Sequence, residues 1–126
     1  AWIVFVPATG AGLLIVAVLN INNLRDIADD AVSGKNTLVV RMGFRFGQLY
    51  QAGLVIGALV CFSLFVIMAD NRLASWLFLL AVPWLARYVW MVFKGGSPAG
   101  MRPLLGQTVG LTLLTCFLFS AGICLP

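Results

Sequence analysis

The chain has 126 residues, of which 62% are hydrophobic and only 10% are charged, and its mean hydropathy is +1.05. A soluble domain of this size buries only about two-thirds of the surface that its unfolded chain exposes, so it could not hide this much apolar surface. The composition excludes a soluble globular domain, a disordered tail and a nucleic-acid-binding module, and it indicates an integral membrane protein. The net charge of +4 then reflects membrane topology rather than binding to a polyanion.

Four apolar runs are long enough to cross a membrane, which takes about 20 residues of helix. Three of them carry no charge, and the other contains only Arg87. We therefore expect an all-α membrane protein with four transmembrane helices at about 2–22, 48–69, 73–93 and 104–124. Pro83 should kink the third helix, and Arg87 lies close enough to its end for the side chain to reach the interface.

The numbers of histidine and cysteine residues limit the catalytic and metal-binding groups that the chain can supply. Histidine is absent, so the chain supplies no histidine base or metal ligand. Three cysteines lie singly in apolar runs without metal-site spacing, which favours a structural role: Cys61, Cys116 and Cys124. The chain begins with Ala1 rather than Met and shows no signal-peptide pattern, so we expect a piece of a longer protein.

Charge is concentrated in the first connector, residues 25–47, which holds seven of the twelve charged residues. The second connector, 70–72, is predicted as a tight turn, and the third, 94–103, as a Gly/Pro loop. The first and third connectors hold six Lys/Arg and the second holds one, so the positive-inside rule predicts that the first and third lie in the cytoplasm. We expect a multi-pass protein of the cell (inner or plasma) membrane, with residues 25–47 as a cytoplasmic cap loop. Aromatic residues near the ends of the third helix are interpreted as interface anchors: Trp76, Tyr88 and Trp90.

The segment 22–30 contains the polar residues that are candidates for metal binding and catalysis. If the first helix continues beyond its apolar run, Asn22, Asp26 and Asp30 lie four residues apart and share one face. The two carboxylates repel each other, and both lie at the helix end that disfavours negative charge, so a bound cation would explain them. Oxygen ligands of this kind suit Mg²⁺, which binds through one or two carboxylates together with substrate phosphates.

Basic residues follow in the same connector. Gly34 allows the chain to turn, and after it come three donors suited to a phosphate group: Lys35, Arg41 and Arg45. The alternative is a solvated polar cap in which Arg25 pairs with Asp29 and the basic residues serve topology alone. The crowding of these groups in an otherwise almost uncharged chain favours the functional interpretation.

A resemblance to a known family rests on the pattern Asn22-Asn23-Leu24-Arg25-Asp26-x-x-x-Asp30-x-x-x-Gly34-Lys35-x-Thr37-Leu38-x-Val40-Arg41-x-Gly43. It resembles the second aspartate-rich motif of the UbiA superfamily of intramembrane prenyltransferases. Its opening is most similar to the branch of 1,4-dihydroxy-2-naphthoate polyprenyltransferases of menaquinone biosynthesis. The segment 102–108, which opens the last apolar helix, also resembles that branch.

The resemblance implies nine transmembrane helices around a central cavity, of which residues 1–126 would be the last four, as the C-terminal part of one transmembrane domain. Carried over by position, Asp26 and Asp30 would be catalytic and would bind Mg²⁺ with Asn22. Asp29 fits the motif less strictly. The diphosphate would be bound by Lys35, Arg25 and Arg41. The implied partners are polyprenyl diphosphate, an aromatic acid, the lipid bilayer and the missing N-terminal helices, with no nucleic acid among them.

The implied reaction is the Mg²⁺-dependent transfer of a polyprenyl group from polyprenyl diphosphate to 1,4-dihydroxy-2-naphthoate. These 126 residues alone are expected to be inactive, because the first aspartate-rich motif of the superfamily is absent from them. Two alternatives stay open. The chain could belong to a UbiA-type prenyltransferase with another aromatic acceptor, or it could be a non-enzymatic four-helix membrane protein.

Overall fold

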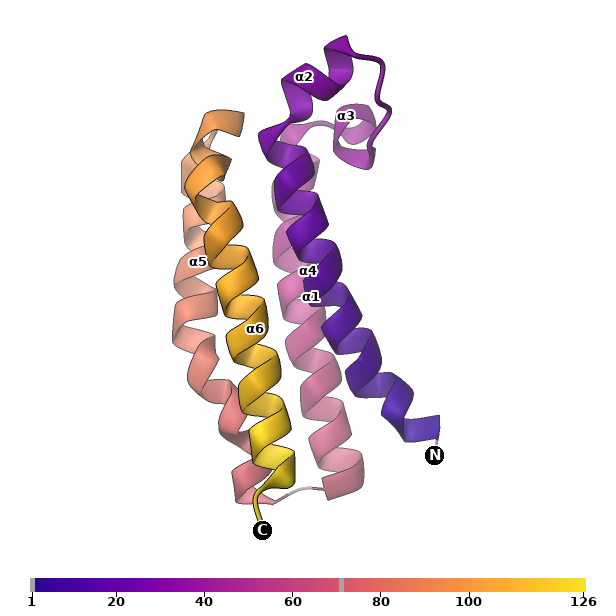
Figure 1. The fold of residues 1–126 in the computed structure, drawn as a ribbon, viewed down its shortest axis with the longest axis vertical. Coiled ribbons are helices and arrows are strands. Elements are labelled where there is room, and N and C mark those ends of the chain that lie inside the picture. The colour runs from indigo at the N-terminus through magenta and orange to yellow at the C-terminus, as the bar shows by residue number, and fades with distance from the viewer. Residues whose placement is uncertain (1, 71) are drawn as a thin grey trace.

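The structure is a computed structural model that describes residues 2–70 and 72–126. Four long helical rods run up and down side by side, and two short helices lie beyond one end of them as a cap (Figure 1). In chain order the rods are η1 (Trp2–Val4) with α1 (Phe5–Arg25), α4 (Phe44–Phe65) with η2 (Val66–Asp70), η3 (Leu73–Ala81) with α5 (Val82–Gly95), and η4 (Pro98–Met101) with α6 (Arg102–Cys124). The cap consists of α2 (Ile27–Val32) and α3 (Leu38–Met42).

Each rod is long and apolar enough to cross a membrane, which confirms the predicted all-α membrane fold with four transmembrane helices. The candidate spans in the described part of the chain are Trp2–Arg25, Phe44–Ala69, Leu73–Gly95 and Pro98–Cys124. The second and fourth helical rods begin earlier than the sequence predicted. Gly43, whose φ of 97° suits glycine, directly precedes α4, while Pro98 lies in the first turn of η4.

The third rod changes helix type where the sequence predicted a kink. Residues 73–81 form a 3₁₀-helix, and the α-helix begins at Val82 with Pro83 in its first turn. Proline fits this position because its missing N–H would have no partner inside the helix there. The connector predicted at 70–72 includes Asn71, which lies outside the described residues.

Aromatic side chains fill the core at the end of the bundle opposite the cap. Phe62 of α4 stacks on Phe119 of α6, with ring centroids 4.5 Å apart, and meets Phe78 of η3 edge to face at 5.7 Å. Phe62 and Phe78 are almost completely buried. These contacts join three rods through large apolar side chains, which pack well in such arrangements.

At the other end of the core, buried polar side chains join all four rods, and we call Asn20, Gln51, Tyr88 and Thr108 the four-helix polar network. Asn20 of α1 donates to Gln51 of α4 at 2.9 Å, and Gln51 donates to the hydroxyl of Tyr88 of α5 at 2.8 Å. That hydroxyl lies 2.5 Å from the hydroxyl of Thr108 of α6. The interpretation of Tyr88 as an interface anchor is therefore wrong, because its side chain is buried and hydrogen-bonded in the core.

The polar network continues into a close approach between α1 and α4 at Gly47. Asn20 also donates a hydrogen bond of 3.0 Å to the carbonyl oxygen of Gly47. A Cβ atom at this position would lie 2.3 Å from Leu24 Cδ2 and 2.8 Å from Val39 Cγ1, and both of these side chains are fully buried. Only glycine leaves room for α4 to pass this close to the end of α1, where the polar motif begins.

Candidate active site

Asn22, Asp26 and Asp30 lie one helical turn apart, although the helix does not continue regularly through them. The backbone N–H of Asp26 donates to the carbonyl of Asn22 at 3.2 Å, and that of Asp30 donates to the carbonyl of Asp26 at 2.8 Å. Asp26 itself has φ −97° and ψ 11°, so α1 ends before it and α2 begins after it. The predicted spacing of one turn is present, although the helix is interrupted at Asp26.

Arg25 binds two of these three side chains. Its Nε donates to Asp26 Oδ1 at 2.9 Å, and its Nη2 donates to Asp26 Oδ2 at 3.0 Å and to Asn22 Oδ1 at 2.6 Å. The sequence had suggested a pairing of Arg25 with Asp29, one turn further on. The structure instead pairs Arg25 with its immediate neighbour, in the two-pronged geometry that guanidinium and carboxylate groups favour.

Positive charges from three parts of the fold act on Asp26. The hydrogen bonds of Arg25 are the main cause that holds the pKa of this carboxyl below its ordinary value, while its partial removal from water opposes the shift. The charges of Arg25, Lys35 and Arg102 lower the pKa further. Asp26 is therefore ionised at neutral pH, and both of its carboxylate oxygens accept hydrogen bonds from Arg25.

Arg102 is a site residue that sequence reasoning did not select. It is the first residue of α6, far from the aspartate motif in the chain, and its charge acts on Asp26 across the cap end of the bundle. One signal was present in the sequence, because Arg102 is the charged residue that directly precedes the last apolar run. The family resemblance covers residues 102–108 but implies no role for Arg102.

Asp30 differs from Asp26 because one of its oxygens has no partner. Its Oδ2 is buried and forms no hydrogen bond with any described residue. A buried carboxylate oxygen in this condition is costly unless a cation or a donor reaches it. It is thus the atom in this cluster that most needs an external ligand.

The chain then reverses, as the sequence predicted at Gly34, where φ is 81°. The turn brings the backbone N–H of Lys35 to the carbonyl of Asp30 at 2.9 Å, and the Ser33 hydroxyl donates to the same carbonyl at 3.2 Å. These bonds hold Lys35 close to the acidic residues. Its exposed side chain is a donor available to an anionic ligand.

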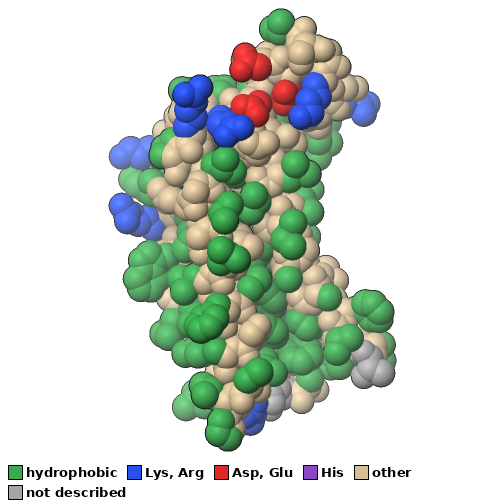
Figure 2. All heavy atoms as spheres, in the orientation of Figure 1, with side chains coloured by type: hydrophobic (Ala, Val, Ile, Leu, Met, Phe, Trp, Pro, Cys, Tyr) green, Lys and Arg blue, Asp and Glu red, His purple; other side chains and the backbone are tan. Residues whose placement is uncertain are grey.

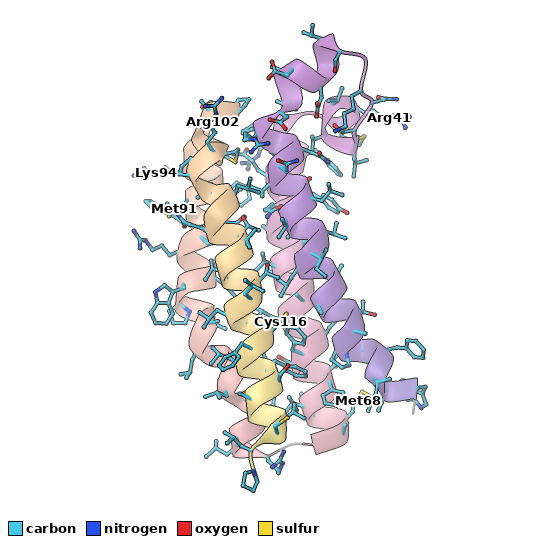
Figure 3. All side chains as sticks on the ribbon, in the orientation of Figure 1. Arg41, Met68, Met91, Lys94, Arg102 and Cys116 are labelled. Atoms are coloured by element: carbon cyan, nitrogen blue, oxygen red, sulfur yellow. The ribbon has the colours of Figure 1, made fainter. Side chains whose placement is uncertain are left out.

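The remaining charged residues of the connector lie apart from this cluster. Arg41 is exposed on α3 and projects from the outer side of the cap (Figure 3). Arg45 lies over the ring of Phe93, 5.0 Å from its centroid, so the structure turns it toward α5 rather than toward the carboxylates. Asp29 is exposed. Figure 2 shows that most charged side chains gather at the cap end, above a largely hydrophobic bundle.

An apolar groove leads away from the cluster. It runs between α1 and α6, has a volume of about 630 Å³ and begins beside Asn22. Its other lining residues are Ile15, Val18, Leu19, Leu105, Val109, Thr112 and Leu113. The polar motif therefore lies at one end of an open groove with a mostly apolar lining.

The donor set fits a hard divalent cation such as Mg²⁺. The candidate ligands are the carboxylates of Asp26 and Asp30 and the amide oxygen of Asn22, and Mg²⁺ prefers such oxygen ligands. The buried, unpartnered Oδ2 of Asp30 supports this fit. In the described part of the chain, no three His, Cys, Asp or Glu residues lie close enough to form a metal site by themselves. The residues present would thus supply an incomplete shell, which phosphate oxygens or water must complete.

The sequence profile of the UbiA prenyltransferase family matches residues 1–105. The chain is 51% identical over 117 residues to a 1,4-dihydroxy-2-naphthoate octaprenyltransferase of Escherichia coli, a match that covers 93% of the chain and 38% of that relative. It is 43% identical over 120 residues to the octaprenyltransferase of the same name from Haemophilus influenzae, covering 95% of the chain and 39% of the relative.

A third relative, with the same name and from Mycobacterium tuberculosis, is 35% identical over 124 residues, covering 96% of the chain and 40% of its own length. The chain thus spans about two-fifths of the length of the curated relatives that it matches. No solved structure shows a significant match to the chain. The match of the family profile over most of the chain, which includes the whole acidic motif, shows that the chain belongs to the UbiA prenyltransferase family.

Proposed function

We propose that this chain is part of a membrane prenyltransferase that transfers a polyprenyl group from polyprenyl diphosphate to 1,4-dihydroxy-2-naphthoate in menaquinone biosynthesis. Family membership and the names of the relatives support this reaction. The observation that carries the proposal is the cluster of Asn22, Asp26 and Asp30 at the head of an apolar groove. The acidic cluster would bind the diphosphate group, and the adjoining groove would bind the hydrocarbon tail.

The head of the substrate would bind at the acidic cluster. Asp26 and Asp30, with Asn22, would hold Mg²⁺, which when bound neutralises a diphosphate as its bond to carbon breaks. Lys35 and Arg25 would donate hydrogen bonds to diphosphate oxygens, since charge-assisted bonds of this type are strong. Arg102 and, by its place in the motif, Arg41 would add positive charge at the same end.

The tail of the substrate would lie in the groove between α1 and α6. The reaction forms an allylic cation, which water would quench, and the apolar lining of the groove keeps water away. The cation then forms a carbon–carbon bond with the electron-rich ring of the acceptor. The carboxylate of the acceptor leaves as carbon dioxide, and the electron pair of its broken bond returns to the ring. The side chains that line the groove thus bind the tail and shield the cation from water. The diphosphate leaves with the electron pair of the broken carbon–oxygen bond.

The topology follows from charge. Residues 25–47 and 94–103 hold six of the eight Lys/Arg, so both segments would face the cytoplasm of a cell-membrane protein. Residues 1–126 would form the C-terminal part of a single transmembrane domain of nine helices. The remaining helices would supply the rest of the metal shell and the acceptor site.

The deciding experiment assays the full-length protein in liposomes with a labelled polyprenyl diphosphate and a panel of aromatic acids, with Mg²⁺ or with EDTA. We expect prenylated product with 1,4-dihydroxy-2-naphthoate only when Mg²⁺ is present. Transfer to a different aromatic acid alone would show that this acid, and not 1,4-dihydroxy-2-naphthoate, is the acceptor. The absence of transfer to every acceptor would contradict the proposal.

A further inference from the structure

The guanidinium of Arg25 already holds the oxygens that the proposed metal site needs. It contacts both carboxylate oxygens of Asp26, at 2.9 and 3.0 Å, and the side-chain oxygen of Asn22 at 2.6 Å. A cation of the protein itself therefore engages two of the three proposed ligands. Asp30 differs, because its buried Oδ2 has no hydrogen-bond partner among residues 2–70 and 72–126.

A guanidinium and a divalent ion compete for such oxygens. Both are attracted to the same carboxylate and amide oxygens, and two cations beside one carboxylate repel each other. The site cannot use Asp26 and Asn22 as metal ligands without weakening the hydrogen bonds of Arg25. The displaced guanidinium then needs a new anionic partner, because otherwise its charge-assisted hydrogen bonds are lost.

A diphosphate is a suitable new partner, since the planar fork of arginine matches pairs of phosphate oxygens. The position of Arg25 allows the change. It is the last residue of α1, and the following residue, Asp26, leaves helical geometry. The Arg25 side chain is also 31% exposed, so it can reorient without disturbing the packed core.

We propose that Arg25 is an exchange residue, which holds Asn22 and Asp26 in the substrate-free site and transfers its hydrogen bonds to the diphosphate when that ligand binds. The inference rests on the proposed function, because it takes Asn22, Asp26 and Asp30 as metal ligands. Its consequence is that Arg25 opposes the binding of metal alone and favours the binding of diphosphate with metal. Each ligand would thus bind more tightly when the other is present.

The test measures binding in the full-length protein in nanodiscs, by calorimetry with Mg²⁺ alone and then with inorganic pyrophosphate at saturating Mg²⁺. For Arg25→Gln we expect about tenfold tighter binding of Mg²⁺ and about tenfold weaker binding of pyrophosphate, within the range of ordinary coupling between sites. Shifts in opposite directions are the signature, because a purely structural role weakens both or neither. Arg25→Lys, which keeps the charge without the fork, should show the same two shifts at smaller size.

Two further variants separate this inference from the proposed function. Lys94→Gln removes a positive charge near the same end of the bundle, where Lys94 lies over Trp90, and should change neither affinity. Asp26→Asn should weaken Mg²⁺ binding and abolish the gain from Arg25→Gln. If Asp26→Asn weakens Mg²⁺ binding but Arg25→Gln does not strengthen it, the exchange is wrong and the metal site stands. If Asp26→Asn leaves Mg²⁺ binding unchanged, the metal site is wrong and the exchange fails with it.

Discussion

The hydroxyl oxygen of Tyr88 lies 2.5 Å from that of Thr108, which joins α5 to α6 inside the bundle. Tyr88→Phe removes this contact and the hydrogen bond from Gln51, while Thr108 keeps its bond to the Leu104 carbonyl. We expect the free energy of unfolding to fall by about 0.6–1.7 kcal/mol, the usual range for hydrogen bonds between membrane helices. Unfolding in mixed micelles measures the loss. Tyr50→Phe, at a half-buried ring stacked on Phe46, is the control, and an equal loss there would contradict the prediction.

Gly47→Ala should destabilise the packing of α1 on α4. The added methyl group would lie within 3 Å of Leu24 and Val39, which are both fully buried and cannot move aside easily. Overpacking of this kind costs about 1–3 kcal/mol. Gly53→Ala on the same helix meets nothing within 4 Å and should be neutral or stabilising, since alanine favours helix. Thermal unfolding of the two variants compares them directly, and equal melting temperatures would refute the assigned contact.

Asp26→Ala and Asp30→Ala in the full-length protein should each abolish prenyl transfer while leaving membrane insertion intact. Each change removes a proposed oxygen ligand, and the remaining ligands cannot hold a divalent ion with substrate. Asp29→Ala should cause a smaller loss, because that side chain is exposed and lies outside the described contacts of the cluster. Product formation and membrane fractionation are the measurements. Full activity of either of the first two variants would remove the metal role.

Lys35→Ala should raise the KM for the prenyl diphosphate by about tenfold or more, since a hydrogen bond to a charged group contributes about 1.5–3 kcal/mol. The KM for the aromatic acceptor should change little. The reason is the position of Lys35, which the turn at Gly34 holds beside Asp30. Steady-state kinetics with each substrate varied in turn tests this split, and equal changes in both KM values would exclude a specific phosphate role.

The pH response of Asp26 should depend on Arg25. Because the hydrogen bonds from Arg25 lower the pKa of Asp26, the pair stabilises the fold at neutral pH, and this contribution is lost as the pH falls through the lowered pKa. Arg25→Gln should therefore move the titration of Asp26 to higher pH. Carbon NMR of labelled aspartate in the full-length protein follows this carboxyl. An unchanged midpoint would mean that Arg25 and Asp26 are not paired in solution.

The sequence predicted the four rods well because long uncharged runs have few alternatives in a membrane. The spacing of Asn22, Asp26 and Asp30 also follows from helical periodicity, and the backbone bonds between them confirm it. The break at Asp26 could not be predicted, because it depends on how the cap folds back over the helix end. That break also accompanies the pairing of Arg25 with its neighbour instead of with a residue one turn away.

Contacts between distant segments of the chain also could not be predicted from the sequence. Tyr88 looked like an interface residue because it lies near a helix end, and its burial is decided by Gln51 and Thr108 on two other rods. Arg102 acts on Asp26 although 75 residues separate them in the chain. Spacing along one helix carries no information about either pair. The roles proposed for the site residues remain predictions that the variants above address.

Under the proposed function, the groove between α1 and α6 would receive the isoprenoid tail, and this placement has a consequence for how the tail is recognised. A tail that enters the groove moves from one apolar environment to another, since the substrate is already dissolved among lipid acyl chains before it binds. Little water is released on entry, and the usual gain from burying hydrocarbon is largely missing. Discrimination among tails of different length would then be weak along the groove. Retention of the substrate would depend mainly on its charged head beside Asn22 and Asp26.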